Sequence, residues 1–330
     1  PGGRARVGAV DGASRRHENR RAQRGAAVLM ALFVATLATL IVSGLFWNQF
    51  VLLRTIENQQ LVTQSRLLLR GALDWARAIL RDDQRNPTDN LDEPWATGLA
   101  ETRLDQLGET SALAAQATMS GSVEDAQSRL NLRNLIRSDF EIDQYERDSL
   151  RKLCSVLDLP EAIADLVALQ MREALAPRAE EAEGRAGDPA KPRPIPLVLP
   201  EDLLAVPGVD PAHALKLAPY VVVLDMPTPV NLNTAREEVV AARFPRMSLS
   251  EAKSFVADRD RTYFVNTGDT RIARHRNNGE PTDTQISVAT RYFIVRGQVK
   301  LDRASTRMEA LVRRGDTQQL PVRVLWQREL

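Results

Sequence analysis

The most pronounced pattern along the chain is an uncharged run, residues 26–53, directly behind an arginine-rich stretch, residues 15–25. A helix rises about 1.5 Å per residue, so the most apolar part, residues 26–47, has roughly the length needed to cross a 30 Å hydrocarbon layer. Backbone groups in lipid must be hydrogen-bonded internally, which predicts a helix. Arginines are retained on the cytoplasmic side. The pattern therefore predicts a membrane anchor with a cytoplasmic N-terminus and an external C-terminal domain.

The helical pattern continues beyond the membrane segment. Apolar residues recur near helical spacing as far as Leu80, with arginine, glutamine and glutamate between them. We therefore predict one long helix over residues 26–81, whose second half lays an apolar stripe on a sheet. Asn86 and Pro87 end it. Three segments near the C-terminus are typical of an antiparallel meander: residues 292–299, 306–312 and 321–326.

In the middle of the chain, the sequence pattern predicts a strand and a turn at residues 117–132, followed mainly by helices. The helices are expected at residues 139–175 (broken near Pro160), 200–219 and 234–258, with a Pro-, Glu- and Ala-rich linker at residues 176–200. Two capping boxes are predicted, because a hydroxyl residue is followed three residues later by glutamate. They are Thr234 with Glu237, and Ser248 with Glu251.

Composition and residue spacing argue against catalysis. Lys and Arg number 44 against 43 Asp and Glu, and because the leader is basic the remainder is mildly acidic, which does not favour a phosphate-binding surface. The lone Cys154 lies in a helical pattern typical of a core residue and cannot form an internal disulfide. The three histidines, His17, His213 and His275, show no metal-ligand spacing. No phosphate-binding loop or nucleophile motif occurs. We therefore predict that the chain is not an enzyme.

The junction at Gly25 allows three interpretations. A cleavable secretory signal is disfavoured, because the apolar run is too long and lacks a small-residue cleavage site after it. A signal anchor without processing is the second. The third is cleavage between Gly25 and Ala26, because residues 24–32 resemble the leader junction of type IV pilins and pseudopilins. That resemblance implies removal of the leader by a prepilin peptidase, followed by methylation of Ala26.

The fifth residue after this junction departs from the common pilin pattern. Most pilins carry glutamate there, where it pairs with the N-terminal amine of a neighbouring subunit, but this chain has Met30. A carboxylate in an apolar environment is costly unless paired, so a subunit with no neighbour stacked above it gains by losing the acid. The K-type minor pseudopilin of type II secretion systems, which caps the pseudopilus, characteristically lacks this glutamate. Three further segments resemble that family: residues 91–96, 122–132 and 230–240.

The resemblance implies an α+β fold, in which a long N-terminal transmembrane helix packs on a small antiparallel sheet and carries a large inserted all-helical domain. It divides the chain into a cleaved cytoplasmic leader (1–25), a long helix that spans the membrane in its first half (26–85), the first strands of the pseudopilin domain (86–135), an inserted helical domain (136–285) and C-terminal strands (286–330). It also implies a non-enzymatic tip subunit that initiates pseudopilus assembly for export of folded periplasmic proteins across the outer membrane.

The same resemblance implies where the chain acts and with what. The expected location is the inner membrane, single-pass, with a periplasmic C-terminal domain that reaches the tip of the pseudopilus. Expected partners are the I-type and J-type minor pseudopilins, the prepilin peptidase, the inner-membrane secretion platform and membrane lipid, but no nucleic acid. Some K-type relatives bind calcium in the inserted domain. Residues 168–173 of this chain lack clustered carboxylates, so we predict no metal and no cofactor.

A membrane-anchored DNA-uptake receptor is the alternative, because residues 230–256 also resemble a helix-hairpin-helix module. DNA-binding hairpins use a glycine turn to bring backbone amides to phosphate. The turn at residues 244–249 has no glycine. An earlier candidate at residues 206–210 keeps Gly208 but places Asp210 where phosphate would lie. Both segments are therefore interpreted as structural helix pairs.

Overall fold

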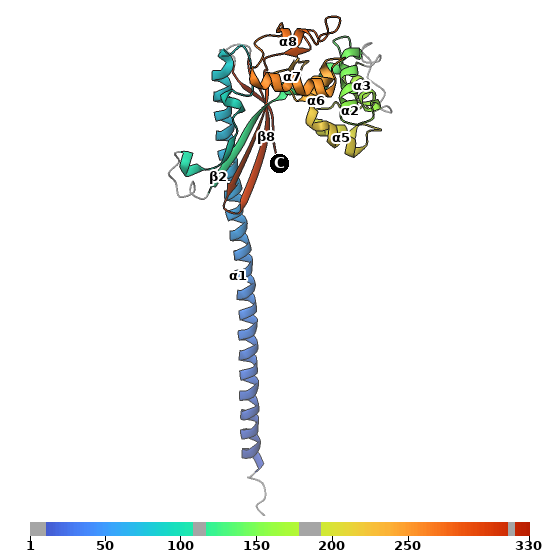
Figure 1. Cartoon of the computed structure of the whole chain (residues 1–330). Coiled ribbons are helices and arrows are strands. Elements are labelled where there is room, and N and C mark those ends of the chain that lie inside the picture. Colours follow the sequence, from blue (N-terminus) through green and yellow to red (C-terminus); the bar gives the residue numbers. More distant parts are fainter. Residues whose placement is uncertain (1–10, 108–116, 178–192, 316–320) are drawn as a thin grey trace, which may run out of the picture. The chain divides into compact units, whose positions relative to one another are not determined.

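The computed structural model of the chain describes residues 11–107, 117–177, 193–315 and 321–330, and its described side chains begin at Ala26 (Figure 1). The chain forms two compact units, Pro1–Gln64 and Ser65–Leu330. The first unit contains the start of the long helix α1 (Asp11–Asp82), and the second contains every strand of the described chain. Most of the linker expected at residues 176–200 lies outside the described residues.

Helix α1 begins earlier than the sequence predicted. It starts at Asp11 instead of residue 26, because residues 11–25 are mostly good helix formers and contain no proline. Its predicted end is confirmed: α1 stops at Asp82 and passes into a 3-10 turn, Asp83–Arg85. Asn86 is then extended, with ψ of 131°, because the ring of the following proline disfavours helical geometry in the residue before it.

Five antiparallel strands form one sheet in the order β1-β2-β7-β8-β9. The three strands predicted near the C-terminus are confirmed, and β2 covers the first part of the predicted strand-and-turn segment. β1 forms one edge of the sheet and lies within residues 86–135, where the first strands of the pseudopilin domain were expected without exact bounds. The strands are β1 (Leu99–Arg103), β2 (Ala117–Asp125), β7 (Tyr292–Leu301), β8 (Ala304–Arg313) and β9 (Arg323–Glu329).

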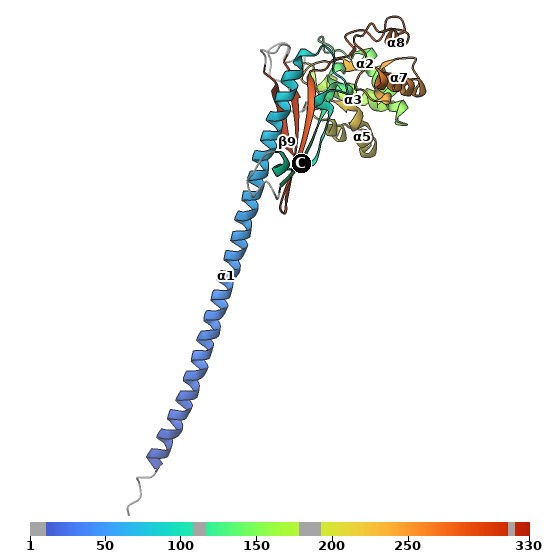
Figure 2. The same ribbon diagram turned by 60° about the vertical axis from the view of Figure 1, so that its left-hand side comes forward.

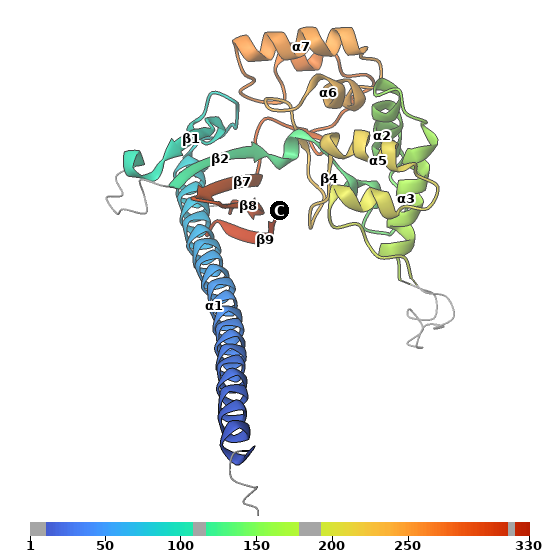
Figure 3. The same cartoon turned by 90° about the horizontal axis from the view of Figure 1, so that it is seen from below.

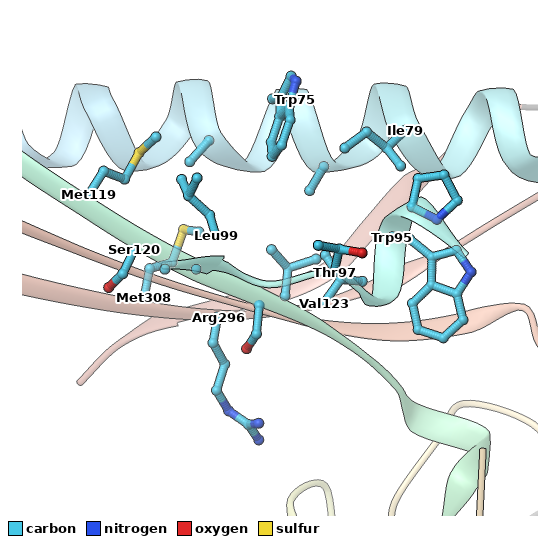
Figure 4. A pocket seen from close by; sticks show the side chains of 17 residues that line it. Trp75, Ile79, Trp95, Thr97, Leu99, Met119, Ser120, Val123, Arg296 and Met308 are labelled. Atoms are coloured by element: carbon cyan, nitrogen blue, oxygen red, sulfur yellow. The ribbon is translucent and has the colours of Figure 1, made fainter. Parts of the chain in front are cut away.

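The last turns of α1 lie along one face of this sheet (Figure 2). Leu69, Leu73 and Leu80 of this segment are at most 5% exposed, which confirms the predicted apolar stripe. Gly297 on β7 permits the close approach, since a Cβ there would lie 3.0 Å from Leu69 Cδ2. Trp75 remains 58% exposed beside a small apolar cavity of about 40 Å³ between α1 and the sheet (Figure 4).

The chain between β2 and β7 forms a predominantly helical insertion with a hydrophobic core of its own (Figure 3). Two short parallel strand pairs also lie there, which the sequence did not predict: β3 (Leu130–Asn131) with β4 (Val221–Val222), and β5 (Val230–Asn231) with β6 (Ile286–Ser287). The described residues of the insertion form the α-helices α2 (Gln144–Val156), α3 (Ala162–Leu175), α5 (Pro211–Leu217), α6 (Glu237–Arg243), α7 (Leu249–Arg261) and α8 (Thr270–Ala273).

Two of the predicted helices are shorter than expected. The segment 200–219 begins as a 3-10 helix, Pro200–Ala205, and only Pro211–Leu217 is α-helical. Gly208 separates them with a φ of 86°, in the left-handed region that favours glycine. The segment 234–258 divides into α6 and α7, because Pro245 lies between them and cannot continue a helix.

Candidate functional site

The first half of α1 has the surface of a helix that lies in an apolar environment. Among the described residues it is part of the one helix that is long and apolar enough to cross a membrane. Its large side chains are exposed, with Leu29 at 70% and Trp47 at 69%. The hydroxyls of Thr36 and Thr39 donate to carbonyl oxygens of the preceding turn at 2.8 Å. These threonine hydroxyls are therefore hydrogen-bonded within the helix, and the helix surface is mainly apolar.

The predicted processing site belongs to this helix. Gly25 lies within α1, and Ala26 and Met30 are exposed on it, Met30 to 70%. Cleavage after Gly25, methylation of Ala26 and a tip-defining role for Met30 stay predictions.

A second site is buried where the insertion meets the sheet. Asn231 Nδ2 donates to Asp125 Oδ2 at 2.8 Å and to the backbone oxygen of Asp89 at 3.1 Å. Thr234 Oγ1 donates to the same Asp125 oxygen at 2.5 Å. Asp125 ends β2, Asp89 follows α1, and Asn231 lies in the segment 230–240 singled out in the sequence. Three distant segments are thus joined by one set of hydrogen bonds.

Arg314, directly after β8, extends this network. Its guanidinium pairs with Asp83 at 2.5 Å and with Asp89 at 2.7 Å, and donates to the backbone oxygen of Thr290 at 2.7 Å. It also lies 5.2 Å from the centre of the Phe293 ring. Its side chain is only 7% exposed. We call the combined network the polar joint, formed by Asp83, Asp89, Asp125, Asn231, Thr234 and Arg314.

The role predicted for Thr234 was wrong. The N-cap of α6 is Arg236, which makes no side-chain cap bond. Thr234 lies two residues before it, and its hydroxyl donates to Asp125 instead of capping the helix. The neighbouring Asn233 holds the segment after α7 by donating to the Phe264 oxygen at 2.9 Å. The second predicted capping box, Ser248 with Glu251, is confirmed.

The polar joint holds more acid than base. Burial raises the pKa of Asp89 to about 7, although the nearby Arg314 lowers it. Burial also raises the pKa of Asp125, against the hydrogen bond from Thr234. Asp89 Oδ1 is buried without a hydrogen-bond partner. A buried carboxylate without full compensation binds a proton instead, so Asp89 titrates near neutrality.

The stability of the folded chain should therefore depend on pH through the protonation of Asp89. Its pKa is higher in the folded chain than the ordinary 3.8, so the folded state binds more protons between about pH 4 and 7, and stability falls as the pH rises through that window. Asp89→Asn imitates the protonated acid and should flatten this fall. Thermal unfolding of both chains from about pH 4.5 to 8 measures it. An equally steep fall in both chains would contradict the assignment.

In the described part of the chain, one group of three carboxylates is close enough together to bind a metal ion. Ligand atoms of Asp83, Asp89 and Glu93 lie within 4.8 Å of one another. Arg314 already pairs with two of these acids, and Trp95 Nε1 donates to Glu93 at 2.6 Å. The group therefore fits a guanidinium better than a divalent cation, which would be repelled by Arg314. The absence of a cofactor stays a prediction.

The turn between α6 and α7 is occupied in a way that does not suit DNA. Lys152 Nζ donates to the carbonyl oxygens of Phe244, Pro245 and Met247 at 2.6, 3.1 and 2.7 Å. A turn that binds an ammonium group through its carbonyls does not present amides to a phosphate. In the earlier candidate, the Asp210 carboxylate caps α5 by accepting from the backbone amide of Ala212. Both hairpins are structural.

Candidate groups for catalysis are also placed in structural roles. Cys154 is fully buried, and burial raises the pKa of its thiol to about 12, so it has no thiolate character near neutrality. This confirms Cys154 as a core residue. The His275 ring packs near the rings of Phe244 and Phe255, with centroid distances of 6.2 and 5.8 Å.

Together, these features define a class of protein. A helix with an exposed apolar first half, whose last turns pack on an antiparallel sheet, has the architecture of a membrane-anchored pilin-like subunit. The helical insertion between β2 and β7 is the feature that separates this chain from a plain pilin fold.

Comparisons with known proteins agree with this class. Two sequence models described as type II secretion system protein K match residues 128–227 and 230–288. Type II secretion system protein K of Pseudomonas aeruginosa PAO1 is 27% identical over 313 residues, which cover 90% of this chain and 91% of that protein. A chain in the crystal structure of the GspK-GspI-GspJ complex from enterotoxigenic Escherichia coli has a TM-score of 0.65 at 21% identity, covering 83% of this chain and 98% of that one.

The chain is similar to protein K of type II secretion systems along most of its length, and this similarity supports the role of a minor pseudopilin. The fold class predicted from the sequence is confirmed, and the alternative of a DNA-uptake receptor is not favoured. The family is a structural component of the secretion system. The match to the family spans the insertion, including Asn231 and Thr234 of the polar joint.

Proposed function

We propose that this minor pseudopilin is the tip subunit of the pseudopilus and initiates its assembly, without enzymatic activity and without a cofactor. The observation that carries the proposal is Met30, an exposed neutral side chain at the fifth position after the proposed cleavage site. A neutral residue there removes the need for an amine partner above the subunit. Assembled at the tip, the chain serves export of folded periplasmic proteins across the outer membrane.

The proposed topology follows from the charge asymmetry around α1. The arginine-rich leader stays in the cytoplasm, residues 26–47 cross the inner membrane, and the sheet and insertion lie in the periplasm. A prepilin peptidase removes residues 1–25 and Ala26 is methylated. The inner-membrane platform then extracts the helix from the lipid.

The proposed partners are the I-type and J-type minor pseudopilins. The similar solved chain comes from a complex with GspI and GspJ. On this chain the second half of α1 offers an exposed uncharged stripe beside the cavity of Figure 4, with residues four positions apart. Leu67 is 60% and Trp75 58% exposed, and a Cβ at Gly71 would meet nothing within 4 Å. Such a stripe fits the apolar helix of a neighbouring pseudopilin.

Co-expression of the full chain with a prepilin peptidase and both partners tests the proposal. The mature chain is expected to begin at Ala26 and to copurify with both partners, because processing leaves the apolar helix intact for packing. Gly25→Val should retain the leader, since the branched side chain blocks cleavage at the junction, and Gly44→Val in the same helix is the matched control. N-terminal sequencing and mass spectrometry give the result. A mature terminus upstream of Ala26 in the unaltered chain would refute processing at this junction.

A further inference from the structure

The face of the sheet opposite α1 carries a row of charged side chains. Successive residues of a strand point to opposite faces, so Gly297 faces α1 while Arg296 faces away from it. Figure 4 shows Arg296 extending from the sheet on the side opposite the helix. Glu309 on β8 lies directly across from Arg296 and from Arg328 on β9. Cross-strand neighbours of opposite charge stabilise one another.

These side chains form an alternating ladder of ion pairs. Glu309 accepts from Arg296 Nε at 2.9 Å and from Arg328 Nε at 2.8 Å, and is only 5% exposed. Glu124 pairs with both Arg296 and Arg129. Arg328 also pairs with Glu201 of the insertion at 2.7 Å. The order along the ladder is Glu201, Arg328, Glu309, Arg296, Glu124 and Arg129.

The alternation of acidic and basic side chains ends at Arg129, because the next charged side chain, Arg236, is also an arginine. Arg236 is close enough to oppose the charge of Arg129, whose pKa is lowered mainly by burial and further by the like charges of Arg296 and Arg236. No acid in the described part of the chain forms an ion pair with Arg236. Its guanidinium is instead held 5.7 Å from the centre of the Tyr220 ring.

Two cavities meet at this pair of arginines. One has a volume of about 320 Å³ and the other about 240 Å³, and both are lined by Arg129, Arg236, Glu124 and Pro219. The acids that line either cavity are already engaged, in the ladder or, for Asp125, in the polar joint. The larger cavity is also lined by apolar side chains, among them Leu199, Ile294 and Trp326.

We propose that Arg129 and Arg236 bind a carboxylate of an acidic polypeptide segment, which becomes the next member of the ladder. Arginine suits this role because its planar fork of N–H donors matches a carboxylate. The apolar lining favours a polypeptide over a small inorganic anion, since neighbouring side chains of a peptide cover that lining while a phosphate leaves it exposed to water. The site goes beyond the proposed assembly function, which uses the opposite, α1 side of the sheet.

Fluorescence anisotropy on the full chain in detergent tests this site. The probe is a fluorescein-labelled hexapeptide of alternating glutamate and leucine, compared with one in which glutamine replaces glutamate. The chain should bind the acidic peptide, and Arg236→Ala should weaken binding about tenfold, because removal of one partner of a charged pair sacrifices at least that much. Arg261→Ala is the matched control, since that side chain is 81% exposed on α7 and lines neither cavity.

Each outcome bears on the proposal. Selective loss in Arg236→Ala, with the glutamine peptide bound at least tenfold more weakly than the acidic one, supports it. Equal losses in both variants, or no binding of the acidic peptide, overturn it. Displacement of the peptide by inorganic phosphate at equal concentration also overturns it, because the site would then be a plain anion site. Retention of the I-type and J-type partners by Arg236→Ala separates this result from any failure of the assembly proposal.

Discussion

Arg314→Leu is expected to lower the free energy of unfolding by about 3–5 kcal/mol, because it leaves buried acids without their cation. Asp83 and Asp89 both pair with the Arg314 guanidinium, and their side chains are 5% and 0% exposed. Removing one partner of a buried pair costs more than the pair itself contributes. Urea unfolding at about pH 8, where Asp89 is charged in the native chain, measures the loss.

Arg313→Leu is the matched control for that experiment. Its guanidinium lies 3.4 Å from Asp225, and the side chain is 31% exposed, so its loss should cost no more than about 1 kcal/mol. At about pH 5 the defect of Arg314→Leu should shrink, because Asp89 then takes up a proton and no longer needs the cation. Equal costs for the two substitutions would show that the polar joint is not held by Arg314.

The sequence predicted the elements whose signals are local. The apolar stripe from Leu69 to Leu80 and the three C-terminal strands were found because each repeats at its own period within a short window. The capping box at Ser248 and Glu251 has the same local character. These elements agree with the α+β fold that the resemblance to K-type pseudopilins implied.

The polar joint could not be predicted, because its partners are far apart in the chain. Thr234 and Asp125 are 109 residues apart, and Asp83 and Arg314 are 231 apart. A local rule assigned Thr234 to a capping box. In the structure, its hydroxyl donates to the buried carboxylate of Asp125 instead. The signal that was available was the pair of asparagines at 231 and 233, whose amide groups are rarely buried unless they bind backbone.

The polar joint also suggests why the insertion and the pilin-like part belong to one unit. Asn231 and Thr234 come from the insertion, whereas Asp83, Asp89 and Arg314 come from segments that flank α1 and β8. The hydrogen bonds of Asp125 and Asp89 connect the two sets. A helical domain inserted between two strands of a sheet is thereby held at its base by buried, directional bonds as well as by apolar packing.

Met30→Glu is expected to reduce secretion several-fold while leaving the external domain folded. An acid within a membrane helix costs up to about 3 kcal/mol when it has no partner, and a subunit with no neighbour above it supplies none. Met30→Leu keeps the apolar character and should secrete normally. Export of a reporter enzyme from cells that lack the native chain measures the effect, and immunogold labelling of pseudopili locates the subunit. Unchanged export with Met30→Glu, or labelling along the shaft with the unaltered chain, would contradict the tip assignment.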